Sequence, residues 1–118
     1  MGYAYLKPTA ITDMVEIPDE PYYIFDVEDG ESTKGMSPEK AEKTFKSQRR
    51  SALTAAEVMA LATHTDVLSR HNLWASGSRC NAAVLVPSVW LNGDRPGFSW
   101  SCTDSSFSEC GSPSLGSR

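Results

Sequence analysis

The feature that most constrains this sequence is a pair of short apolar runs near its C-terminus, separated by a turn signal. Val84–Leu91 is rich in β-branched and aromatic residues, and it is followed by Asn92-Gly93, residue types that readily adopt positive φ in a tight turn. Beyond the turn, Phe98, Trp100 and Cys102 alternate with small residues. We therefore predict a β-hairpin over residues 84–102 whose apolar face requires a core.

Length and composition restrict the class of protein. At 118 residues the chain is predicted to form a single domain, 1–118, with an extended N-terminal segment (1–20) and a Ser/Gly-rich tail (103–118) that is either pinned or partly disordered. A net charge of −4 argues against a nucleic-acid partner, which needs a basic surface. The chain has no apolar run of membrane length and no signal peptide at its start, so we expect a cytoplasmic protein with no membrane contact.

Two helices are predicted from their start signals. Ser37-Pro38-Glu39 places an N-cap, a first-turn proline and a first-turn acid in order, so a short helix should run to about Ser47. Thr54-Ala-Ala-Glu57 is a capping box, and Leu53 and Val58 occupy the positions of a hydrophobic staple. A new N-cap at Thr65-Asp66 predicts a break after that second helix.

One further strand completes the expected fold. In Pro21–Val27 the side chains of Tyr23, Phe25 and Val27 would share one face, and those of Tyr22, Ile24 and Asp26 the other. Both faces are partly apolar, which indicates a strand inside the sheet. We predict an α+β fold in which this strand and the hairpin form an antiparallel sheet, with two or three short helices packed on one face.

Several short motifs resemble an uncharacterised actinobacterial family, catalogued as a domain of unknown function. They are Tyr23–Gly30, Leu53-Thr-x-x-Glu57, His64, Leu68, Gly77-Ser-Arg79, Pro87-x-x-Trp90, Arg95-Pro96 and Trp100. The resemblance covers about residues 18–118. Members of that family carry an additional N-terminal segment, so the resemblance implies that this chain is a shortened version. It implies no activity.

Candidate reactive groups are few. Cys80 follows a Gly-Ser-Arg loop and adjoins Arg79, a setting that lowers a thiol pKa, and His64 or His71 could serve as its base if the fold brings it near. The alternative is that Cys80 is simply a small residue at the start of a strand. His64 and His71 with the three cysteines, Cys80, Cys102 and Cys110, lack the close spacing of a zinc site, so we expect neither a metal nor another cofactor. Cys102 and Cys110 would pair only in a secreted protein.

The same region suggests a ligand site. Ser78 and Arg79, with Arg95 near the hairpin turn, offer hydroxyl and guanidinium groups suited to an anion, and Trp90 and Trp100 could form an apolar wall. The leading hypothesis is a protein that binds or transforms a small anionic molecule, as an accessory or biosynthetic activity in an actinobacterial pathway. The alternative is a non-catalytic interaction module or homodimer that uses exposed aromatics of the hairpin or an unpaired sheet edge.

Overall fold

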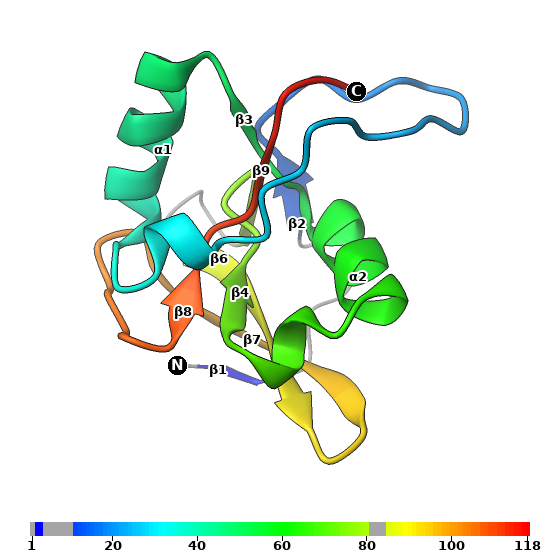
Figure 1. Cartoon of the computed structure of the whole chain (residues 1–118). Coiled ribbons are helices and arrows are strands. Elements are labelled where there is room, and N and C mark those ends of the chain that lie inside the picture. The colour runs from blue at the N-terminus through cyan, green and yellow to red at the C-terminus, as the bar shows by residue number, and fades with distance from the viewer. Residues whose placement is uncertain (1, 4–10, 81–84) are drawn as a thin grey trace.

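The computed structural model of this chain describes residues 2–3, 11–80 and 85–118, with Gly2, Tyr3 and Cys80 described through their backbone only. Helices and strands are mixed along the chain, which confirms the α+β class (Figure 1). In chain order the elements are β1 (Gly2–Tyr3), β2 (Ile11–Asp13), the 3-10 helix η2 (Glu31–Thr33), α1 (Pro38–Gln48), β3 (Ser51–Ala52), α2 (Ala55–His64), the 3-10 helix η3 (Val67–Ser69), β4 (Asn72–Trp74), β5 (Ser78–Cys80), β6 (Leu85–Asn92), β7 (Arg95–Cys102), β8 (Cys110–Gly111) and β9 (Ser114–Leu115).

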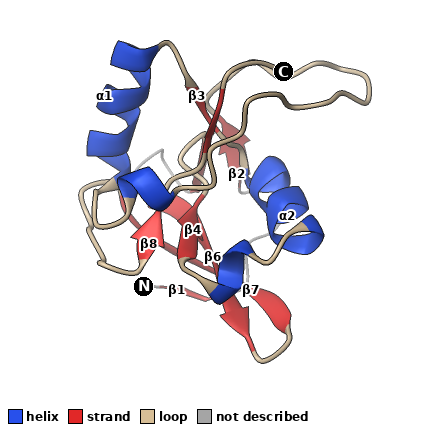
Figure 2. Ribbon diagram, viewed as in Figure 1, coloured by secondary structure: helices blue, strands red, loops and turns tan. Residues whose placement is uncertain are grey.

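The main sheet is built around the β6–β7 hairpin. Its strand order is β1-β7-β6-β4-β8. In addition, β5 pairs with the first residue of β6, Leu85, and also with β2. All pairs are antiparallel except β4 with β8, which is parallel. A separate two-stranded ribbon, β3–β9, lies between the two α-helices (Figure 2).

The predicted hairpin is present, but its turn is displaced by one residue. Residues pair in register from Leu85↔Cys102 to Asn92↔Arg95, so Asn92 is still within the strand and Gly93-Asp94 forms the loop. Gly93 has a φ of +68°, and Asp94 is not among the positive-φ residues. Positive φ at the first loop position alone is the requirement of a type II′ turn, which glycine satisfies. Val84, the expected start of the hairpin, lies outside the described residues.

Both predicted helix starts are confirmed. Ser37 accepts a hydrogen bond from the Lys40 amide, and Pro38 is the first residue of α1. At α2 the capping box is complete: the Thr54 hydroxyl accepts from the Glu57 amide at 3.3 Å, and the Glu57 carboxylate accepts from the Thr54 amide at 2.9 Å. The expected break is also present, because α2 ends at His64 and η3 begins at Val67.

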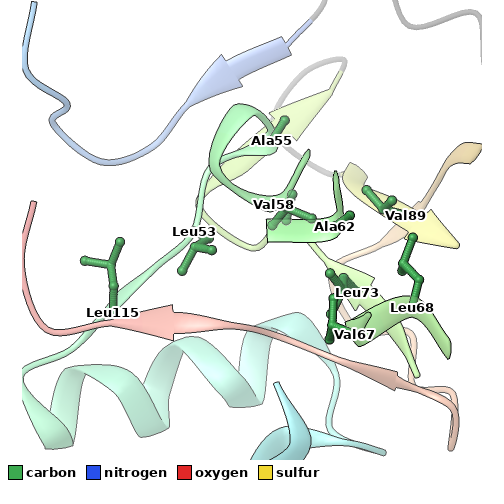
Figure 3. Packing of buried hydrophobic residues seen from close by; sticks show 10 residues of the cluster. Leu53, Ala55, Val58, Ala62, Val67, Leu68, Leu73, Val89 and Leu115 are labelled. Atoms are coloured by element: carbon green, nitrogen blue, oxygen red, sulfur yellow. The ribbon is translucent and has the colours of Figure 1, made fainter. Parts of the chain in front are cut away.

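The main core lies between α2, η3 and one face of the sheet (Figure 3). Leu53 and Val58, the two staple residues, are fully buried, and Leu73 and Val89 meet them from β4 and β6. Leu115 of β9 joins the same cluster, which anchors the tail. Burying a leucine or valine contributes roughly 1.5–3 kcal/mol each, so this cluster holds α2 against the sheet.

The predicted strand Pro21–Val27 is wrong. Two isolated bridges, Phe25↔Ser117 and Glu28↔Ser114, take its place. Asp26 between them has a φ of +56°, which interrupts the alternation of a strand. Arg50 holds this kink by donating to the carboxylate and the carbonyl of Asp26.

The structure also places the tail and α1, for which the sequence left open the order of the tail and predicted helices on one sheet face. Residues 103–118 were expected to be either a pinned irregular segment or partly disordered; they contain the short strands β8 and β9. Ser112 and Ser114 are buried, and the Thr33 hydroxyl donates to the Ser112 carbonyl and accepts from the Ser112 amide. The helix α1 does not share the sheet face covered by α2. It packs on β3 through Ala41, Phe45 and Ala52.

Candidate functional site

The face of the main sheet opposite α2 carries a groove of about 510 Å³. Side chains alternate across a strand, so the residues that flank the core-facing Leu73, Val89 and Phe98 point to this second face. The groove is lined by Asn72, Trp74, Ser88, Trp90, Leu91, Ser99, Phe107, Ser108, Glu109 and Cys110, and we call it the aromatic groove. Its volume is within the range of sites for small ligands.

The floor of the aromatic groove is polar at its centre. Ser88 of β6 and Ser99 of β7 are directly paired across the hairpin, and their hydroxyl oxygens lie 2.6 Å apart. Both residues are buried. Beside them Trp74, Val86 and Cys110 form a small apolar cluster.

The walls are aromatic. The Phe107 ring, from the segment between β7 and β8, stacks on Trp74 with centroids 5.8 Å apart and the planes inclined by 24°. Trp90 lies over Gly97 on the neighbouring strand, where a Cβ would meet its ring at 3.0 Å. Glycine at this position therefore lets the indole lie flat across the hairpin.

One polar atom in this wall is unsatisfied. Trp74 is fully buried, and its Nε1–H has no acceptor among the residues that the structure describes. A buried donor without an acceptor costs roughly 1–3 kcal/mol. Unsatisfied buried groups are uncommon in native proteins and call for an explanation.

Cys110 and Glu109 are the titratable groups among the described lining residues. Burial raises the pKa of the Cys110 thiol far above its usual range, so this sulfur stays protonated and is a poor nucleophile. Glu109 is exposed at the rim, and its backbone carbonyl oxygen accepts a hydrogen bond from the Asn72 amide nitrogen at 2.7 Å. None of the described lining residues is a lysine, arginine or histidine.

Of the residues expected to bind a ligand, only Trp90 lines this groove. Trp100 pairs with Pro87 and lies on the opposite face, since its neighbour Ser99 points into the groove. Arg95 is exposed beside the hairpin turn. The structure therefore separates the two tryptophans that were expected to form one wall.

Ser78 and Arg79 are committed to contacts within the protein. The Ser78 hydroxyl accepts from the Ala55 amide at 2.8 Å and donates to Asp13 at 2.7 Å. The buried Arg79 guanidinium donates to the carbonyls of Ser76 and Ser78 and pairs with Glu42 of α1.

The expected pairing of Cys80 with His64 lies outside the described residues, because Cys80, in β5, is described through its backbone only. His64 is exposed at the end of α2. Cys102 and Cys110 are both free thiols. Within residues 2–3, 11–80 and 85–118, no group of three or more His, Cys, Asp or Glu side chains is arranged to hold a metal.

Sequence reasoning missed most of the groove. Trp74 and Phe107 were visible as aromatic residues, but nothing in their spacing indicated that they stack. The available signal was the alternation of Val86, Ser88 and Trp90, which places them on one face of β6. The covering segment around Phe107 gave no periodic signal.

The fold and groove define a class of protein: an α+β domain with an open aromatic groove on its sheet. The chain belongs to the family of unknown function DUF5701, whose model matches residues 6–103. The matched range includes Trp74 and Trp90 and ends before Phe107, Glu109 and Cys110. No curated protein and no solved structure matches the chain. None of the helices in the described part is long and apolar enough to cross a membrane.

Proposed function

We propose that this chain binds a small organic molecule in the aromatic groove, with an oxygen acceptor of the ligand on the Trp74 Nε1–H. The observation that carries this proposal is the buried indole N–H without an acceptor, in the wall of a groove of about 510 Å³. Apolar walls with a few placed polar groups are typical of small-molecule sites. The Ser88 and Ser99 hydroxyls supply further polar contacts on the floor.

The three indole N–H resonances test this proposal directly. Titration with acetophenone, a neutral ketone, should shift the resonances of Trp74 and Trp90 in a saturable way and leave that of Trp100 unchanged. Trp74→Phe removes the donor and should weaken binding about fivefold, the equivalent of one hydrogen bond worth about 1 kcal/mol. Trp100→Phe, on the opposite face, is the matched control and should retain full affinity. Shifts confined to Trp100, or an unchanged affinity in Trp74→Phe, would contradict the proposal.

An anionic ligand in a second cavity is the other candidate function. A hollow of about 310 Å³ between α1 and the β4–β5 turn is lined by Arg79, Arg50 and Lys46 among others, and three cations at one cavity favour an anion. Arg79 and Arg50 are already paired with Glu42 and Asp26, which leaves less charge for a ligand. If this cavity binds an anion, inorganic phosphate should shift the amide resonances of Lys46 and Arg79 saturably, and Lys46→Met should reduce the affinity for phosphate. Phosphate shifts that do not saturate would remove this candidate.

Self-association remains a proposal as well. Met14, Tyr23 and Phe25 are more than half exposed, and all three lie in the segment that projects from the molecule between β2 and η2 (Figure 1). Exposed apolar side chains grouped on one segment favour a partner surface. Light scattering at increasing protein concentration measures whether a homodimer forms.

A cytoplasmic location and an actinobacterial pathway stay predictions from the sequence.

A further inference from the structure

We propose that the ligand of the aromatic groove is an organic cation of the methylated ammonium type. This rests on the proposed function of the same groove and names its ligand class. The cationic head would lie against the faces of Trp90 and Phe107, with the Glu109 carboxylate at the rim.

The charge of the groove supports a cation. Glu109 contributes a carboxylate at an exposed position, and no basic side chain is among the described lining residues. Cys110, the other titratable group among the described lining residues, is held in its neutral form by burial, which raises the pKa of its thiol. The two arginines expected to attract an anion lie elsewhere: Arg79 pairs with Glu42, and Arg95 lies beside the hairpin turn.

The chemistry of the walls supports the same class. The described lining residues include two indoles and one phenyl ring; Trp74 is fully buried beneath Phe107, whereas Phe107 and Trp90 retain exposed surface. The negative face of an aromatic ring attracts a cation, most strongly for tryptophan. Quaternary ammonium groups are bound in this way in sites with several aromatic walls. A carboxylate beside such rings adds an attraction that a neutral ligand of equal shape does not experience.

The unsatisfied Trp74 Nε1–H adds a second requirement. This buried donor belongs to the residue that pairs with Ser88 across the sheet, and it calls for an oxygen acceptor on the ligand. A molecule with a methylated ammonium at one end and an oxygen at the other meets both conditions. Choline is the simplest probe of this kind, and 3,3-dimethylbutan-1-ol has the same shape without the charge.

Calorimetric titration of the full chain with these two probes tests the ligand class. Choline should bind at least about tenfold more tightly than the neutral alcohol. Glu109→Gln should lower the affinity for choline about threefold to fivefold and leave the affinity for the alcohol unchanged, because it removes only the charge interaction. Asp94→Asn makes the same acid-to-amide change at the hairpin turn, outside the groove, and should leave choline affinity unchanged.

The outcomes distinguish the cation proposal from the proposed binding of a small molecule on which it rests. Equal affinity for choline and the alcohol would overturn the cation proposal while leaving small-molecule binding in place. An equal loss in Asp94→Asn and Glu109→Gln would also overturn it, because the effect would then reflect net charge alone. Binding of acetophenone with no binding of choline would exclude a cation and keep the groove as a ligand site.

Discussion

Glu57→Gln is expected to lower the free energy of unfolding by about 3–5 kcal/mol, the cost of leaving one partner of a buried ion pair uncompensated. The Glu57 carboxylate is almost fully buried and pairs with Arg118 through Nε at 2.7 Å. It also accepts from the Thr54 amide and from the Tyr22 hydroxyl at 2.8 Å. Three segments far apart in the sequence thus meet at one side chain.

Urea denaturation measures this effect, and Glu39→Gln is the matched control. Glu39 is an exposed acid in the first turn of α1, so its loss should cost about 0.5 kcal/mol, the contribution of a charge to the helix dipole. If the two variants lose similar amounts, the contacts of Glu57 with Arg118 and Tyr22 do not stabilise the fold.

The same carboxylate makes the stability depend on pH. Burial alone would raise the pKa of Glu57, but hydrogen bonds from Arg118, the Thr54 amide and Tyr22 outweigh it and hold the pKa below the ordinary value of 4.5. A lowered pKa in the folded state contributes stability that is fully present above pH 4.5 and lost as the pH falls through the folded value. Glu57→Gln should therefore differ most from the parent near neutral pH and converge with it in acid. A constant difference across that range would contradict this assignment.

Gly111→Ala is the second substitution with a large expected effect. A Cβ on Gly111 would lie 2.0 Å from the carbonyl oxygen of Gly30, and that oxygen belongs to a backbone that cannot rotate away. We expect a loss of at least about 3 kcal/mol, or failure to fold, because β8 would be forced from η2 and from its place beside β4. Urea denaturation of the purified variant, or its absence from the soluble fraction, reports the result.

Gly35→Ala is the control for that substitution. Gly35 has a φ of +85°, but nothing lies within 4 Å of the position that a Cβ would occupy. Its replacement should cost about 1 kcal/mol, the price of a left-handed conformation alone. If Gly111→Ala costs no more than Gly35→Ala, then the close approach of residues 30 and 111 is not present in solution.

The candidate site was only partly predictable. The period-2 pattern after the turn correctly placed Phe98 and Trp100 on one sheet face, but Trp90 and Trp100 were expected to form one wall. The register Pro87↔Trp100 with Ser88↔Ser99 assigns them to opposite faces. A strand's own sequence shows which residues share a face, whereas the pairing partner decides how two strands align. The Phe107 wall comes from a tail with no periodic signal.

The predicted strand at Tyr22 failed for a related reason. Its alternation was real, but the segment has only two isolated bridges with the chain near Ser117 and Ser114, and Arg50 binds the kink at Asp26. Arg50 lies 24 residues from Asp26, so no local pattern around the strand could reveal this contact.

By itself, the sequence determined the hairpin, the two capped helices, the break after His64 and the α+β class, because each depends on interactions between residues a few positions apart. Tertiary structure alone decided which sheet face is covered by α2, that the tail forms the other wall of the aromatic groove, and that Arg118 reaches Glu57. Those features depend on contacts between distant segments, whose free energy arises only when the whole chain has folded.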